Sequence, residues 1–118
     1  MSAADRRQSP RFDAYDRVRI EMLPQGLALS VIDFSFGGFR AECVAPLGPE
    51  THQFRVSTTD GVKREELTAR AVYCHRLGGP GDTPSYVVGF AFQNTRNPQV
   101  EARILGILDH VTATQHVA

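Results

Sequence analysis

Apolar and polar residues alternate along most of this chain, which is the pattern of half-buried β-strands. In residues 17–22, Val18, Ile20 and Met22 fall on one face, and the charged residues between them fall on the other. Comparable alternating segments recur at intervals of roughly ten residues. They occupy residues 27–33, 39–43, 53–57, 66–76 and 86–92. Six short strands at this spacing predict a mostly β fold, either a closed antiparallel barrel or a sandwich.

Turn residues separate these segments, and the clearest of them is the Asp60-Gly61 hairpin signal. After residue 96 the apolar period changes to that of a helix. Asn97 is a good helix cap, and Pro98 suits the first helical position. Apolar residues then recur at helical spacing, at Val100, Ile104, Ile107, Leu108 and Val111. The sequence therefore predicts an amphipathic C-terminal helix that closes an end of the barrel or covers an edge.

The length of 118 residues corresponds to one domain with a modest core. We expect an arginine-rich, flexible arm at residues 1–12, the barrel at 13–96, and the helix with its tail at 97–118 of the same domain. Two details of the barrel are predicted as well. Tyr73 shares the face of Leu67, Ala69 and Ala71, and Gly89 marks a close backbone approach or a bend.

Composition excludes several classes of function. The 42% apolar content is that of a globular protein, so extensive disorder is not expected. Thirteen basic and thirteen acidic residues cancel, so the chain lacks the overall field of a protein that binds nucleic acid polymers or membrane surfaces. Any anion must therefore be held by a local cluster. The sequence contains neither a membrane-spanning segment nor a signal peptide, and we expect a cytoplasmic protein.

Cysteine and histidine residues do not predict a metal site. The four candidate ligands, Cys43, His52, Cys74 and His75, match no ordinary zinc spacing. We expect the two cysteines to be small buried hydrophobic residues in a reducing compartment. His110 and His116 are expected to interact favourably with the dipole at the end of the helix.

A corner at residues 31–39 combines an acid, a hydroxyl and a glycine pair between apolar runs. It predicts a strand that enters a tight turn and leaves again, with Asp33, Ser35 and the Gly38 amide presented together. The Gly37-Gly38 pair permits positive φ. Taken alone, such a sequence is more often an ordinary hairpin corner.

A basic cluster precedes this corner, because Arg6, Arg7 and Arg11 face a single acid, Asp5, within the first twelve residues. Taken alone, this cluster is more often a solvated terminus. With the corner, it forms a set suited to a guanine nucleotide. Arginine bonds guanine O6 and N7 or a phosphate, and a carboxylate accepts from guanine N1–H and N2–H. Neither motif supplies a poised base or an activated nucleophile, so an enzyme is not expected.

In these motifs the chain resembles the PilZ domain family. The resemblance rests on Arg7-x-x-x-Arg11 and Asp33-x-Ser35-x-x-Gly38, followed by residues 69–73, residues 86–92 and a helix. It implies a six-stranded antiparallel barrel with a C-terminal helix, and it implies binding of cyclic di-GMP. The residues implied to bind this nucleotide are Arg6, Arg7, Arg11, Asp33, Ser35, Gly37 and Gly38. Arginine at position 6 is compatible with an intercalated pair of nucleotides, and Pro10 stiffens the spacer before Arg11.

Two functional hypotheses remain open at this point. The first is a stand-alone receptor, without cofactor, that binds cyclic di-GMP, orders its N-terminal arm and passes the signal to an unidentified effector protein. The second is an adaptor of the same fold that binds a protein partner but no nucleotide. Either is expected to be a monomer or a weak homodimer.

Overall fold

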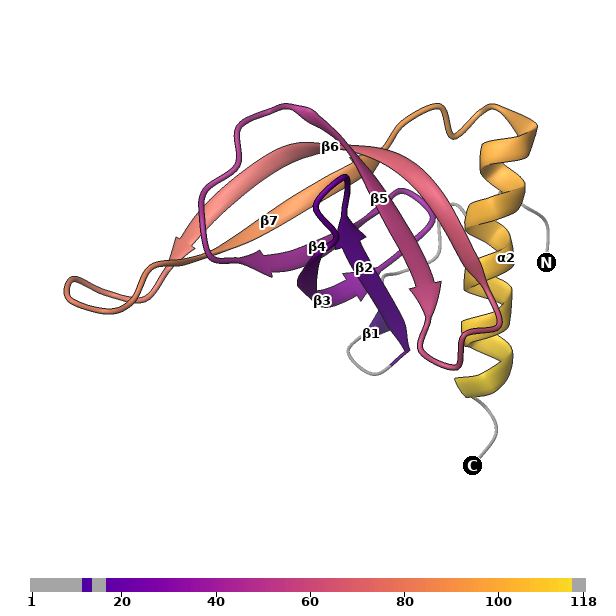
Figure 1. Ribbon diagram of the computed structural model, residues 1–118, viewed down its shortest axis with the longest axis horizontal. Coiled ribbons are helices and arrows are strands. Elements are labelled where there is room, and N and C mark those ends of the chain that lie inside the picture. The colour runs from indigo at the N-terminus through magenta and orange to yellow at the C-terminus, as the bar shows by residue number, and fades with distance from the viewer. Residues whose placement is uncertain (1–11, 14–16, 116–118) are drawn as a thin grey trace.

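A computed structural model describes residues 12–13 and 17–115 of the chain, with the side chains of residues 17–113. It contains seven strands and one helix (Figure 1). The strands are β1 Phe12–Asp13, β2 Val18–Met22, β3 Leu27–Phe34, β4 Gly38–Cys43, β5 Thr51–Thr58, β6 Arg64–Leu77 and β7 Ser85–Phe92, and the helix is α2 Pro98–Gln115. The six predicted strands and the predicted helix are confirmed. The two-residue strand β1 was not predicted.

The six longer strands close into an antiparallel barrel. Their hydrogen-bonded order is β3-β2-β5-β6-β7-β4, and the ring is closed by pairing between β3 and β4. The short strand β1 lies beside β3, where Phe12 is opposite Phe34 and Asp13 is opposite Asp33. The barrel, and not a sandwich, is therefore the fold.

Strand β6 is the longest element of the barrel, and it changes neighbours along its length (Figure 1). Its first half pairs with β5 as far as Arg70, and its second half pairs with β7 from Ala69 to Leu77. A β-bulge interrupts the pairing with β7 between Ala71 and Tyr73. This bulge determines which residues beyond it face outward.

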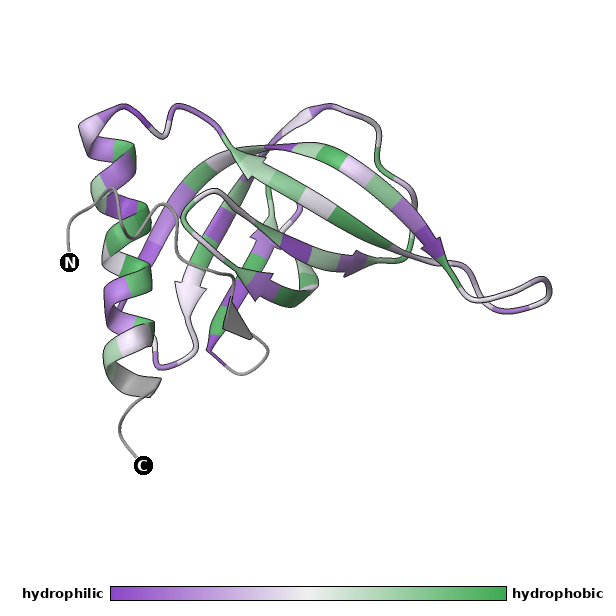
Figure 2. Cartoon of the chain, turned by 180° about the vertical axis from the view of Figure 1, so that it is seen from behind, coloured by the Kyte–Doolittle hydropathy of each residue, from purple (hydrophilic) through white to green (hydrophobic). Residues whose placement is uncertain are grey.

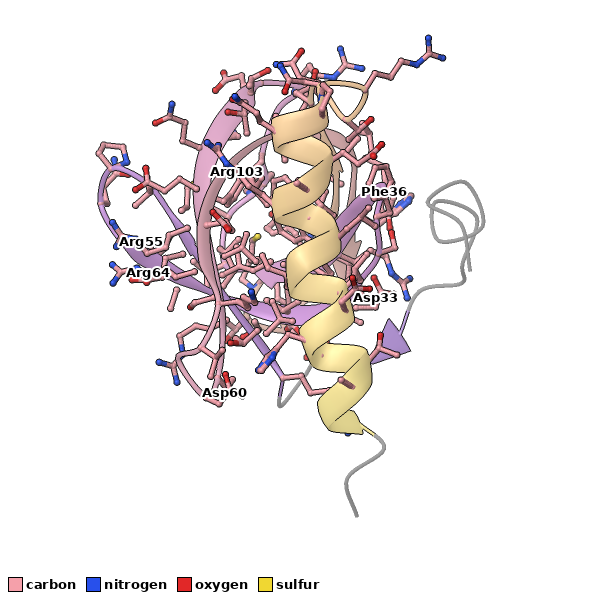
Figure 3. The ribbon with its side chains drawn as sticks, turned by 90° about the vertical axis from the view of Figure 1, so that its right-hand side faces the viewer. Asp33, Phe36, Arg55, Asp60, Arg64 and Arg103 are labelled. Carbon is pink, nitrogen blue, oxygen red and sulfur yellow. The ribbon has the colours of Figure 1, made fainter. Side chains whose placement is uncertain are left out.

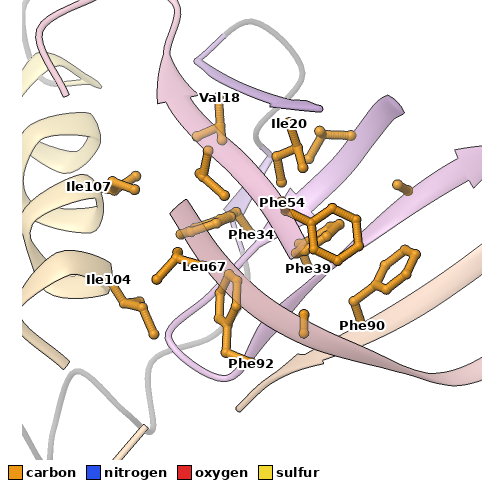
Figure 4. Packing of buried hydrophobic residues seen from close by; sticks show 14 of the residues in the cluster. Val18, Ile20, Phe34, Phe39, Phe54, Leu67, Phe90, Phe92, Ile104 and Ile107 are labelled. Carbon is orange, nitrogen blue, oxygen red and sulfur yellow. The ribbon is translucent and has the colours of Figure 1, made fainter. Parts of the chain in front are cut away.

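The core of the barrel is centred on phenylalanine rings (Figure 4). Phe39 is fully buried, and its ring centroid lies 5.2 Å from Phe54, 4.7 Å from Phe90 and 5.7 Å from Phe92. Apolar and polar positions alternate along the strands in Figure 2, as the sequence pattern predicts. The core is thus built from inward-facing residues of every long strand.

Helix α2 closes one end of this core. Ile104, Ile107 and Val111 are buried against the barrel, and Figure 4 shows the first two directed toward Leu67. At the helix start, the Asn97 side-chain oxygen accepts the Gln99 amide at 2.9 Å, so the predicted cap is confirmed. Over the described part of the chain, no helix has the length and apolarity needed to cross a bilayer.

The hairpin between β5 and β6 fastens α2 to the barrel. Asp60 Oδ1 accepts from the Thr58 hydroxyl at 2.6 Å and from the Val62 amide at 3.0 Å, while Asp60 Oδ2 lies 2.6 Å from His110 Nε2. Because a carboxylate only accepts hydrogen bonds, Nε2 of His110 is the donor. The histidine predicted to interact with the helix dipole therefore binds a side chain of the barrel. His116 lies outside the described residues.

Replacing Asp60 by asparagine should lower the melting temperature at neutral pH. The Thr58 hydrogen bond, followed by those from His110 and the Val62 amide, lowers the pKa of Asp60 below its usual value. A carboxyl whose pKa is lower in the folded protein stabilises the fold above the unfolded pKa, about 3.9, and loses that contribution as the pH falls further. The difference in melting temperature between wild type and D60N should therefore shrink on acidification. A matched control is D82N, because Asp82 accepts the Gly79 amide within the β6–β7 loop.

Candidate functional site

The corner between β3 and β4 is closed by hydrogen bonds to two carbonyl groups. The Ser35 amide donates to the Gly38 carbonyl at 2.8 Å, and the Ser35 hydroxyl donates to the same oxygen at 3.2 Å. The Gly37 carbonyl accepts the Phe92 amide at 2.9 Å. Ser35 and Gly38 are brought together as predicted, but through the Gly38 carbonyl. The hydroxyl of Ser35 therefore helps to form the turn.

The predicted reason for the glycine pair is wrong. Positive φ occurs at Gly26, Gly61, Gly78 and Gly81 among the described glycines, and at neither residue of the pair. Gly38 is instead required by a close approach between strands. A Cβ atom at this position would lie 1.8 Å from the carbonyl oxygen of Phe90 on β7, whereas one at Gly37 would have no neighbour within 4 Å.

Asp33 is held by Arg40, which the sequence reasoning did not identify. The two residues are opposite one another in the β3–β4 pairing. Arg40 Nε donates to Asp33 Oδ2 at 2.7 Å, and Arg40 Nη2 lies 2.5 Å from the same oxygen. The hydrogen bond to Asp33, and then the attraction between the charges, raise the pKa of Arg40 above its usual value. Asp33, which was predicted to face a ligand, is only 6% exposed. Its carboxylate is already paired with the Arg40 guanidinium.

Residues on neighbouring strands extend the Asp33–Arg40 pair into a row across the outer surface of the barrel. Arg40 is opposite Gly89 on β7, and Gly89 is opposite Tyr73 on β6. The Tyr73 ring lies over Gly89, because a Cβ there would be 2.2 Å from Tyr73 Cε1. The close approach predicted at Gly89 is thus confirmed. Beyond Tyr73, the row ends near His75, whose ring centroid is 5.2 Å from that of Tyr73.

The prediction that Tyr73 shares the buried face of β6 is wrong. Strict alternation places it on the face of Ala71, which is buried, but Tyr73 is 37% exposed. The bulge between these two residues adds one residue to β6 and turns Tyr73 outward. Consequently an acid, a guanidinium and an aromatic ring are adjacent on one surface, although they come from three strands.

The arginine motif lies outside the described residues. This applies to Arg6, Arg7 and Arg11. The strand β1 begins at the residue after Arg11 and is paired with the end of β3, where Asp13 is opposite Asp33. Figure 3 shows Asp33 and Phe36 on one side of α2, with Arg55, Arg64 and Arg103 on the other side.

A polar hollow on the surface does not resemble a nucleotide site. It has a volume of about 350 Å³ and lies between β6 and α2, lined by Arg64, Glu65, Glu66 and Arg103. Two arginines and two glutamates balance one another, and Arg103 Nε is 4.0 Å from Glu65 Oε1. A hollow with as many acids as bases has little net attraction for a phosphate.

The described cysteines and histidines do not form a metal-binding group. In the described ranges no three metal-ligating side chains form a group. Both cysteines are free thiols; Cys43 is buried, as predicted, and Cys74 is half-buried. Burial raises the pKa of the Cys43 thiol.

Comparison with known proteins agrees with this architecture. The chain forms a closed barrel with an adjoining helix, and a family model described as PilZ domain matches residues 5–109. The chain therefore belongs to the PilZ domain family. A solved structure described as the PilZ domain with c-di-GMP of YcgR from Escherichia coli is similar, with a TM-score of 0.57 and 14% identity over 84% of this chain and 83% of that one. No curated protein sequence matches the chain.

Proposed function

We propose that this protein is a non-enzymatic receptor for cyclic di-GMP. The observation that carries the proposal is the position of β1, which follows the arginine motif directly and pairs with the strand end that bears Asp33. Both motifs are complete in the sequence, and the residue that follows Arg11 lies beside the strand end that bears Asp33. Membership of the PilZ family, a cyclic di-GMP-binding domain type, supports the same function.

The outer row has chemistry that suits a guanine base. The Asp33 carboxylate can accept from the N1–H and N2–H donors of guanine, and an arginine fork can bind O6 with N7 or a phosphate. Tyr73 offers an aromatic face for stacking beside this position. In the proposed complex, Arg7 and Arg11 grip guanine and phosphate, Arg6 adjoins them, and the corner forms the facing surface.

Binding would act as a switch through the N-terminal arm. A cyclic dinucleotide brings two phosphate charges, which arginines on the arm can neutralise as the arm folds across the barrel. A micromolar affinity corresponds to about −8 kcal/mol, and a few charge-assisted hydrogen bonds with stacking can supply this after the cost of ordering. The reshaped surface would then be read by an effector protein.

Titration calorimetry with cyclic di-GMP tests the proposal. We expect saturable binding by the wild type and a loss of at least tenfold in affinity for R7A and for R11A, because each variant removes a charge-assisted contact. R55A is the matched control, since Arg55 lies on the other side of α2 from Asp33. Cyclic di-AMP should bind poorly, because adenine lacks the N1–H and N2–H donor pair. Equal binding of both nucleotides, or full affinity in R11A, would refute the receptor function.

One observation favours the second function, an adaptor that binds no nucleotide. Asp33 is buried and paired with Arg40, so guanine would have to displace an existing ionic contact. If the calorimeter records no binding at millimolar nucleotide while the protein remains folded, the Asp33–Arg40 pair is structural. Turnover of cyclic di-GMP would contradict both functions.

A further inference from the structure

We propose that the second half of β6 pairs edge to edge with the same segment of a second copy of this chain. The residues concerned are Tyr73–Leu77. They pair with β7 along one edge, from Tyr73 opposite Gly89 to Leu77 opposite Ser85. Strand β5 follows the other edge only as far as Arg70, and the Glu50 carbonyl accepts the Ala71 amide at 3.2 Å. Beyond that point, the described residues form no backbone hydrogen bond with this edge.

This free edge is apolar as well as unpaired. Tyr73 and Leu77 are 37% and 38% exposed, and Val72 at its start is 51% exposed. Two of the six large hydrophobic side chains that the described surface exposes therefore belong to this segment, and Val72, which adjoins it, is a third. The segment contains no proline and no lysine, and Arg76 is its one permanently charged residue. An edge of this kind is a template for another strand.

The limits of the edge determine where the axis of a symmetric pair would lie. The bulge at Val72 ends the regular strand on one side, and Gly78, with φ of +82°, ends it on the other. In an antiparallel pair of strands, residues directly opposite one another lie on the same face of the sheet. When a two-fold axis relates the strands, one residue is therefore directly opposite its own copy, and the axis passes between the two. If the axis lies at His75, all five residues from Tyr73 to Leu77 are paired with residues of the same segment in the partner. An axis at Cys74 would place Arg76 opposite the partner's Val72 in the bulge, and one at Arg76 would place Cys74 opposite the partner's Gly78.

The pairs created by the His75 axis are chemically compatible. Tyr73 is opposite the partner's Leu77, so an aromatic and an aliphatic residue occupy paired positions twice. Cys74 is opposite the partner's Arg76, so no permanent like charges are opposed. The two His75 rings face each other, and neutral imidazoles supply one donor and one acceptor each. A single strand pair buries much less than the roughly 1,200 Å² of a standard interface, so the dimer is weak. It would extend the surface that carries Tyr73 and Arg40 into the partner.

Cysteine cross-linking tests the position of the axis. In a C43S/C74S background, H75C places two thiols directly opposite one another, within the Cα separation that a disulfide requires. Diamide should convert them to a disulfide and itself take up the two hydrogens. V72C is the control, because its two copies would be displaced by six residues, about 20 Å along the strands. Cross-linking of H75C that is at least tenfold faster than that of V72C is expected, and equal rates would overturn the proposal.

Sedimentation equilibrium of the full chain, without nucleotide, tests the pairing itself. Tyr73 and Leu77 are four residues apart, about 13 Å along β6, so their side chains interact only across a dimer. We expect Y73K and L77E each to raise the dimer dissociation constant roughly tenfold, and the double variant to recover most of that loss through opposed charges. A wild type that stays monomeric to millimolar concentration, or single effects that simply add, would overturn the proposal and leave the edge for a different partner.

Discussion

Substituting valine for Gly38 should strongly destabilise the barrel, whereas substituting alanine for its neighbour Gly37 should leave its stability nearly unchanged. A Cβ at Gly38 would lie 1.8 Å from the Phe90 carbonyl oxygen and 2.9 Å from the Phe90 carbonyl carbon. Both atoms belong to the backbone of β7, which is fixed between β4 and β6. No flexible side chain can move to make room. We expect G38V to lose about 3 kcal/mol or more, a large share of the 5–15 kcal/mol by which domains are stable.

Urea unfolding followed by circular dichroism measures this effect. G37A should unfold within about 0.5 kcal/mol of the wild type, because the position has open space and its φ is not positive. G38A should already shift the midpoint, and an unchanged midpoint would show that the strands separate easily. The comparison also bears on ligand studies. Loss of nucleotide binding in a Gly38 variant would report the loss of the corner, so binding must be measured at residues that leave the fold intact.

Much of the fold could be predicted from local pattern. The alternation at Val18, Ile20 and Met22 locates β2, and the Asn97-Pro98 cap locates the start of α2. Local pattern does not decide between a barrel and a sandwich, because closure depends on distant pairs. Val18, for example, is opposite Thr58. That choice followed from the resemblance of the motifs to the PilZ family.

The residues that form the corner could be predicted from the sequence, but their contacts could not. Asp33, Ser35 and Gly38 do meet at one corner, but their mutual arrangement depends on partners in other strands. One extra residue in β6 reverses the expected direction of Tyr73, and no turn residue marks that bulge in the sequence. Arg40 carried a signal that could have been used. It faces outward on the strand that immediately follows the corner, in a position to pair with an acid on the preceding strand.

Removing the charge of Arg40 should destabilise the protein by about 2 kcal/mol. A fully buried carboxylate that loses its partner costs about 3–5 kcal/mol, and we reduce this figure because the Arg40 side chain is 42% exposed and water can approach from its side. R40M keeps most of the side-chain volume and removes the guanidinium. D33N should cost less, since a half-exposed guanidinium is readily solvated. E42Q, an exposed position on the same strand, is the control and should change stability by less than about 0.5 kcal/mol.

The double variant D33N/R40M separates the structural role of this pair from its proposed role in binding. With neither charge present, no unpaired charge is buried, so its stability should return to within about 1 kcal/mol of the wild type. Its affinity for cyclic di-GMP should nevertheless stay at least tenfold reduced, because asparagine offers guanine N1–H and N2–H a single neutral oxygen in place of a carboxylate. Urea unfolding measures the stability, and titration calorimetry the affinity, of wild type, D33N, R40M and D33N/R40M. If stability and affinity recover together, the Asp33 carboxylate serves only to hold the corner, and the guanine contact must be sought elsewhere on the row.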